Sequence, residues 1–260
     1  MTTVRVPRPM NLWRLEWLRL FRTPRALSLG VVYLAIGLIE PVATRYASTL
    51  IAHVGNGASV RLPKPTPAQA LSAYVSNATL IGLIVLVAVA ASAYGFDTRP
   101  GLAAFFRTRV PSMWQLLAPR FTAYAVGGAV AYLIGTLAAW YETRLLIGTL
   151  PVGGLLAGLL CVAVYLAFAV AVTAFATSLT KATVAAAGIT LGILLALPLL
   201  ADVHAISNWV PSALIGAPAD LVSSPPAHDL VHFLPALGVS AVAGALALAA
   251  AVAGLRRREI

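Results

Sequence analysis

The residue types best suited to metal chemistry gather near the end of the chain. They comprise three histidines and three aspartates: His204, His228, His232, Asp202, Asp220 and Asp229. Imidazole and carboxylate groups are ligands for zinc, but metal sites also need a recognisable spacing between ligands. The spacings in this set match no such pattern. The sequence therefore predicts no metal site.

Catalytic patterns are also missing from the sequence. The single cysteine, Cys161, lies inside an apolar run without the partners of a catalytic triad. There is no glycine-rich phosphate loop ending in Gly-Lys-Ser or Gly-Lys-Thr, no His-Glu-x-x-His run and no Gly-x-Ser-x-Gly elbow. We therefore expect no catalytic residue and no cofactor in this chain, and a membrane enzyme is the weakest of the functional alternatives.

The composition indicates a protein whose main solvent is lipid. Apolar residues make up 60%, charged residues 10%, and the mean hydropathy is +0.90. Soluble domains have roughly 45–50% apolar and about 25% charged residues. A net charge of +10 could suggest nucleic acid as a partner, but most of the charges flank apolar runs. Membrane lipid, and no nucleic acid, is the expected partner.

Six apolar stretches are long enough, or nearly so, to cross a bilayer as helices of about 20 residues. They run over 26–42, 74–94, 121–140, 152–178, 182–201 and 231–255. Glu40 and Pro41 are expected to end the first and shortest span at a membrane surface. The sequence thus predicts an all-α, polytopic membrane protein with six transmembrane helices in a single domain over residues 1–260.

The distribution of Lys and Arg predicts the orientation of these spans. With the amino terminus inside the cell, fourteen of the eighteen basic residues fall on the cytoplasmic side. Such an excess is typical of cytoplasmic segments. Both termini are therefore expected in the cytoplasm of a protein of the cell membrane.

An amphipathic segment precedes the first span, within residues 10–23. Its sequence, NLWRLEWLRLFR, places one apolar stripe opposite basic residues on a helical wheel: Trp13, Trp17, Leu20 and Phe21 against Arg14, Arg19 and Arg22. Trp at headgroup depth with Arg facing phosphates describes a helix lying in the cytoplasmic interface. A plain anchor for the first span is the alternative interpretation.

The connection over residues 97–120 is the longest on the predicted cytoplasmic side. Between Pro100 and Pro111 lies a short segment with aromatic and basic residues: Phe105, Phe106, Arg107 and Arg109. A short helix of this kind could be gripped by another protein. The alternative is a surface loop whose arginines contact lipid phosphates.

The outer segment, residues 202–230, is too apolar for a free loop, yet Pro211 and Pro218 prevent a full span. Short helices that cap the bundle before the last span are expected there.

No ionisable residue is expected near the bilayer centre, where ion-coupled transporters usually place one. If the protein transports, its energy should come from outside the chain.

This layout resembles the type 2 ABC exporter permeases. The likeness rests on the segment NLWRLEWLRLFR before the first span, the long basic connection DTRPGLAAFFRTRVPSMWQLLAPR, the six spans, the apolar outer segment and the terminal GLRRRE. It covers the whole chain but contains no diagnostic motif, and the family's Glu-rich stretch in the connection is reduced here to Asp97.

The resemblance implies a membrane permease that pairs with a second permease, identical or related, on two ABC ATPase subunits that bind ATP. It also implies a coupling helix at about Pro100 to Val110, which would seat in the ATPase, beside an interfacial helix at residues 10–23. A transporter or assembly protein not driven by ATP is the alternative. The transported substrate cannot be read from these residues.

Overall fold

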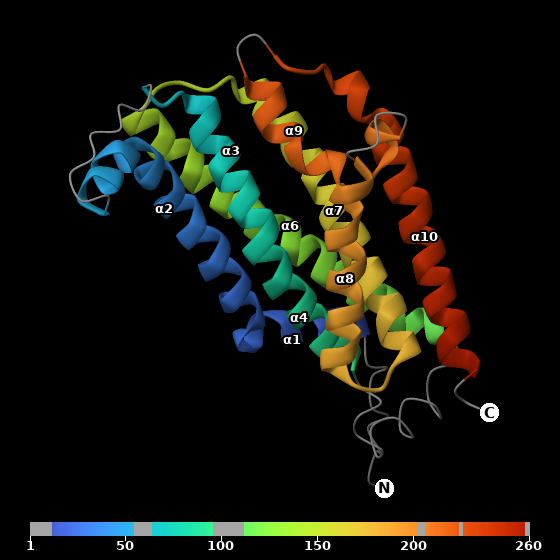
Figure 1. Ribbon diagram of the computed structural model, residues 1–260. Helices are drawn as coiled ribbons and strands as arrows, with labels where there is room; N and C mark the ends of the chain where they lie inside the picture. The colour runs from blue at the N-terminus through green and yellow to red at the C-terminus, as the bar shows by residue number, and fades with distance from the viewer. Residues whose placement is uncertain (1–11, 55–63, 96–111, 202–205, 224–225, 258–260) are drawn as a thin grey trace, which may run out of the picture.

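The computed structural model describes residues 12–54, 64–95, 112–201, 206–223 and 226–257, and every regular element in these ranges is helical. In chain order the elements are α1 (Leu12–Arg22), α2 (Pro24–Val54), α3 (Pro67–Asn77), a π-helical turn η1 (Ala78–Gly82), α4 (Leu83–Tyr94), α6 (Met113–Leu146), α7 (Val152–Leu179), α8 (Thr183–Ala201), η3 (Ser207–Trp209), α9 (Ala213–Val222), η4 (Leu230–Phe233) and α10 (Leu234–Arg257). Figure 1 shows the long helices side by side, with α9 near one end.

Six helical units of this set are long and apolar enough to cross a membrane: α2, α3 with η1 and α4, α6, α7, α8, and η4 with α10. They alternate in direction along the chain. The start of α2 and the end of α10 therefore lie at the same end of the bundle as α1, which we call the α1 end, and α9 lies at the opposite end (Figure 1). The predicted six-span, all-α architecture with short helices before the last span is confirmed.

The predicted end of the first span at Glu40 and Pro41 is wrong, because α2 continues through both residues to Val54. A proline inside a helix removes one hydrogen bond and normally kinks or ends it. Here tertiary contacts hold the helix just before the proline: Gly37 packs against the backbone of Gly135 in α6, and the Asn77 amide donates a 2.8 Å hydrogen bond to the Glu40 carboxylate.

Two other spans begin earlier than their apolar runs indicate, because polar residues cap them. Thr66, just before Pro67, and Gln69, in the first turn of the helix, form a reciprocal capping box, so α3 starts seven residues before Tyr74. The Ser112 side chain accepts a hydrogen bond from the Trp114 amide at the start of α6. Part of the expected cytoplasmic connection, from Met113 onward, is therefore helical and continuous with the third span.

α7 is the most enclosed of the six spans, and a glycine notch on it receives α9. A side chain at Gly154 would collide with the carbonyl of Leu221, and one at Gly158 would collide with the backbone of Pro218. Small residues at four-residue spacing let helix backbones approach closely. Because both glycines face α9, this pair serves packing within the chain.

A polar and aromatic cluster joins α2, α3 and α6 inside the bundle. The Tyr74 hydroxyl donates to the carbonyl of Tyr132 at 3.0 Å, and Thr136 donates to the same carbonyl at 2.9 Å. The ring of Tyr33 lies against Gly82, where any side chain would collide with it. Gly82 ends the π-helical turn η1, a rare geometry that often marks functional sites.

Candidate functional site

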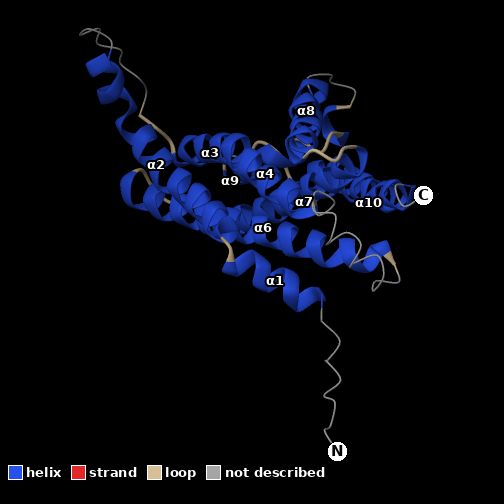
Figure 2. Ribbon diagram, turned by 90° about the horizontal axis from the view of Figure 1, so that it is seen from below, coloured by secondary structure: helices blue, strands red, loops and turns tan. Residues whose placement is uncertain are grey.

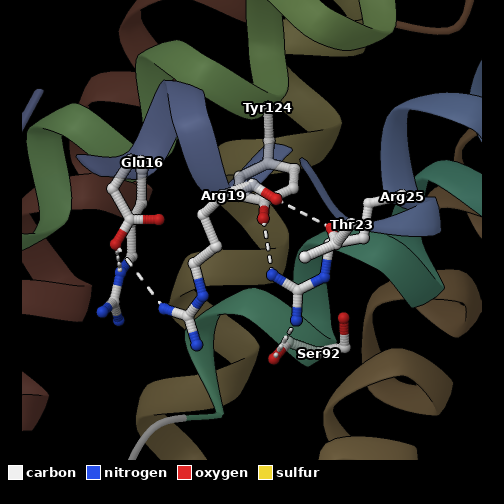
Figure 3. Close-up of polar contacts among 7 residues, drawn as sticks. Glu16, Arg19, Thr23, Arg25, Ser92 and Tyr124 are labelled. Carbon is white, nitrogen blue, oxygen red and sulfur yellow. Dashed lines mark hydrogen bonds and ion pairs between the residues drawn. The ribbon is translucent and has the colours of Figure 1, made fainter. Parts of the chain in front are cut away.

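The polar contacts at the α1 end attach α1 to the bundle, and Figure 3 shows them in close-up. α1 and α2 are separated by Thr23, whose hydroxyl donates to the Arg19 carbonyl at 2.7 Å. Pro24 then opens α2, a favourable position because its fixed φ suits the first helical turn. The chain therefore turns sharply between the two helices, and α1 lies against α6 as seen from below (Figure 2).

The central contact is an ion pair between Glu16 in α1 and Arg120 in α6. Arg120 Nε donates to Glu16 Oε1 at 2.8 Å, and both side chains are almost completely buried, with 1% and 3% of their surfaces exposed. Arg19, one turn further along α1, places its Nη1 atom 3.7 Å from the same carboxylate oxygen. One buried carboxylate thus faces cations from two helices.

A second contact ties the start of α2 to the neighbouring helices. Arg25 donates from Nη1 to the Tyr124 hydroxyl at 2.8 Å, and from Nη2 to the Ser92 carbonyl at 3.4 Å. Ser92 belongs to the last turns of α4 and Tyr124 to α6. Arg25 therefore links three spans near the α1 end, one helical turn away from the Glu16 and Arg120 pair on α6.

The docking surface on α6 is a single helical stripe. Arg120, Tyr124 and Gly127 follow one another at i, i+4 and i+7, the spacing that places side chains on one face of a helix. Leu20 of α1 is buried against Gly127, where an added Cβ would lie 2.9 Å from a Leu20 methyl carbon. The missing side chain at Gly127 leaves the space that Leu20 occupies.

These contacts attach α1 to α6. Removing one partner of a buried ion pair leaves an uncompensated charge and costs about 3–5 kcal/mol. The hydrogen bond to Arg120 and the seated Leu20 fix the position of α1 along α6. The cluster offers no nucleophile paired with a base. It is suited to passing a displacement of α1 to a membrane span.

The predicted interfacial residues fall on two faces of α1. Leu20 is buried, and Trp17 is partly buried with its ring stacked on Phe21 at a centroid distance of 6.0 Å. Trp13 and Phe21 are 48% and 68% exposed, and Arg14 and Arg22 are exposed as well. The helix predicted within residues 10–23 is present as α1, and its position in a lipid interface stays a prediction.

Other sequence-derived candidates lie elsewhere. The coupling candidates Phe105, Phe106, Arg107 and Arg109 lie outside the described residues. Near α9, the rings of His228 and His232 stack at 4.0 Å, and His228 Nδ1 lies 3.3 Å from Asp220 Oδ2. Among the described residues no group of three or more His, Cys, Asp and Glu side chains could hold a metal ion.

Glu16 and Arg120 are not among the residues that the sequence predicts to form a site. A signal was present in the sequence, because Glu16 is the only acidic residue before Glu40 and shares a helix face with Leu20. An acidic residue on the apolar side of an otherwise basic helix needs a buried cation as partner. The identity of that cation, about a hundred residues away, required the fold.

Comparison with known proteins adds one relative. The chain is 21% identical over 140 residues to the uncharacterized transmembrane protein YxlG of Bacillus subtilis strain 168. The match covers 53% of this chain and 54% of that protein, so it spans about half the length of each. No family model matches the chain, and no solved structure matches it. The six helices and this similarity identify a multi-pass membrane protein.

Proposed function

We propose that this chain is the membrane-spanning permease subunit of an ATP-driven exporter of type 2. In this proposal two permeases, identical or related, line the substrate path, and ABC ATPase subunits on separate polypeptides supply the energy. Both termini, and with them the α1 end, face the cytoplasm. The excess of Lys and Arg in the segments at that end supports this orientation.

The observation that carries the proposal is the attachment of α1 to α6 by a buried ion pair. An energy-coupled permease needs a part that a cytoplasmic motor can push and a rigid connection from that part to the spans. α1 presents an exposed basic and aromatic face, while its other face is held by Arg120 and Gly127. The absence of a phosphate-binding loop in the sequence agrees with an ATPase on another chain.

A mechanism follows from these contacts. Closure of the ATPases on ATP would displace α1. Because Glu16 holds Arg120 and Arg25 holds Tyr124, the displacement would reach α2 and α6 at the same time. α2 and α6 pack against each other along the bundle, so both would move as a pair. Such a movement could reshape a path between the two permeases.

The proposal is tested by copurifying a partner protein and by measuring whether the chain alters ATP hydrolysis by that partner. Full-length tagged protein would be purified from its native membrane in mild detergent, and copurifying proteins would be identified by mass spectrometry. We expect a nucleotide-binding subunit whose ATP hydrolysis is altered by the permease. A permease that transports without any nucleotide-binding partner would contradict the proposal and favour a transporter or assembly protein not driven by ATP.

Coupling itself can be tested with a matched pair of variants. Glu16→Gln removes the charge that holds Arg120, whereas Glu142→Gln removes a carboxylate near the opposite end of α6. We expect Glu16→Gln to keep the ATPase bound but to lose most of the transport that ATP hydrolysis drives. Glu142→Gln should behave as wild type. Equal transport by both variants would remove α1 from the coupling mechanism.

A further inference from the structure

A groove lies between α2 and α3 toward the α9 end of the bundle, where the two helices run side by side (Figure 1). Its volume is about 320 Å³, near the lower end of the usual range for small-molecule pockets, about 300–1,000 Å³. The lining combines hydroxyl and amide groups, small apolar side chains and one cation: Thr44, Ser48, Gln69, Ala47, Ala73 and Arg45. In the described part of the chain no acidic side chain lines it. We call it the α2–α3 groove.

The polar side chains of the groove supply hydrogen-bond donors. Gln69 Oε1 accepts a 2.9 Å hydrogen bond from the Thr66 amide, so the other end of this side chain, Nε2, is left to donate. The hydroxyls of Thr44 and Ser48 are bonded to no other described residue. Arg45 is exposed, and its guanidinium forms no ion pair within the described ranges. One cation and three neutral donors therefore meet in a groove whose side-chain amide oxygen is already bonded.

This set of donors complements an oxyanion. Arginine keeps its charge at any ordinary pH, and its fork of N–H groups matches the oxygens of a carboxylate or phosphate. Glu40 is the only acidic residue of α2, but it does not line the groove and lies about 140° around the helix from Arg45. An anion in the groove therefore meets a positive charge without a carboxylate beside it.

The position of Arg45 along α2 corresponds to the lipid headgroups. Twenty residues separate it from Arg25, which lies at the α1 end of the same helix. At 1.5 Å per residue this is about 30 Å, the thickness of the hydrocarbon core of a bilayer. Arginines at the two ends of a span lie in the two headgroup layers, where their charges meet lipid phosphates.

An exposed apolar stripe on α2 leads from the middle of the helix to Arg45. It consists of Val31, Leu34, Leu38 and Val42, which recur at spacings of three and four residues, and Arg45 follows Val42 by three. From Val31 to Val42 the stripe is about 16 Å long, which is about half of the hydrocarbon core. It therefore has the length of one leaflet and ends at the cation of the groove.

We propose that the α2–α3 groove binds the phosphate of a phospholipid in the leaflet at the α9 end, with an acyl chain along the apolar stripe of α2. The guanidinium of Arg45 neutralises the phosphate, the neutral donors bind its remaining oxygens, and the stripe contacts the chain. A soluble phosphate would use only the groove. This inference depends neither on the proposed ATP-driven transport nor on the side of the membrane that the α9 end faces.

The experiment separates the two parts of the ligand with three probes. Dioleoylphosphatidylglycerol has the phosphate and the acyl chains, dioleoylglycerol only the chains and glycerol 3-phosphate only the phosphate. Each would be titrated into the full-length protein in mild detergent, and native mass spectrometry would count the bound molecules. We expect saturable binding of one phosphatidylglycerol per chain, and at least about tenfold weaker binding of the other two probes.

Matched variants identify the site. Arg45→Gln should weaken phosphatidylglycerol binding about tenfold or more, because the phosphate loses its charged donor. Arg144→Gln, which removes an exposed arginine at the same end of the bundle on α6, should leave binding unchanged. Val42→Gln should weaken binding severalfold, whereas Val130→Gln, at an exposed valine of α6, should not. The thermal midpoint of each variant would report whether it is folded.

Several results would overturn the proposal. Equal binding of dioleoylglycerol would mean that the apolar stripe alone attracts lipid, and equal binding of glycerol 3-phosphate would indicate a site for a soluble anion. Equal losses in Arg45→Gln and Arg144→Gln would show a general attraction of anionic lipid to surface arginines. A wild-type protein without saturable phosphatidylglycerol binding, such as a dimer whose second copy covers the stripe, would also contradict it. The probe series on the wild-type protein decides the matter even if a variant does not fold.

Discussion

α1 and α9 are both short helices that dock near the ends of the same bundle, but they are held by different forces. α1 is held to α6 by a buried carboxylate between two arginines. α9 is held to α7 by close backbone contact at Gly154 and Gly158. The first attachment is electrostatic and requires particular charged residues. The second depends on the close steric fit of two helix backbones.

The two attachments should therefore fail differently. A buried ion pair depends on both partners, so that loss of one leaves a charge whose burial is very unfavourable. Packing at a glycine notch depends on shape alone and responds to added volume. α1 is thus the helix whose position a charge change can alter, and α9 acts as a fixed cap.

The largest expected effect is at the ion pair. Glu16→Ala should lower the free energy of unfolding by about 3–5 kcal/mol, because Arg120 loses the carboxylate that compensates its burial. Replacing both residues by apolar ones, Glu16→Leu with Arg120→Met, should recover most of that loss. Denaturant titration in detergent micelles would measure all three proteins. A double variant that is less stable than the single variant would contradict an electrostatic attachment.

A smaller effect is expected at the glycine notch. Gly158→Ala should destabilise the protein by about 1–3 kcal/mol, because the new methyl group meets the backbone of Pro218 in α9. Gly153→Ala is the matched control on the same helix, since an added Cβ there meets nothing within 4 Å. Thermal unfolding would compare the two. Equal midpoints of thermal unfolding would mean that α9 shifts easily to accommodate the new methyl group and does not act as a fixed cap.

The link from α2 to α6 should contribute less than either helix attachment. Tyr124→Phe removes the hydroxyl that accepts the Arg25 hydrogen bond and should cost about 1 kcal/mol. Tyr141→Phe, on the same helix but 56% exposed, serves as the control and should change little. Denaturant titration of both variants would show the difference. If Tyr124→Phe leaves the free energy of unfolding unchanged, the stabilising contact of Arg25 is the hydrogen bond to the Ser92 carbonyl alone.

The smallest effect is expected on α8, which has its own glycine pair. An added Cβ at Gly188 or Gly192 meets nothing within 4 Å in the described part of the chain. The double change Gly188→Ala with Gly192→Ala should therefore alter the free energy of unfolding by no more than about 0.5 kcal/mol. Chemical crosslinking would show whether it separates two copies. Loss of a crosslinked dimer would identify α8 as a surface between two copies of the chain.

The sequence by itself determined the fold class, because a membrane leaves a polypeptide few choices. Apolar runs of sufficient length must cross as helices, since every backbone group needs an internal partner in lipid. The six spans follow from that constraint, and the helix within residues 10–23 follows from its amphipathic periodicity. The first span does not end at Glu40 and Pro41 as expected, because contacts of α2 with α6 and with Asn77 outweigh the helix-breaking effect of proline.

Only the tertiary structure decided which residues meet across the bundle. Glu16 and Arg120 are 104 positions apart, and Glu40 and Asn77 are 37 apart. Helical periodicity places a side chain on a face, but it does not say which other helix covers that face. The same limit applied to the two glycine pairs, which look alike in sequence. One receives α9, whereas the other, on α8, meets no described residue, because packing between helices depends on their three-dimensional arrangement.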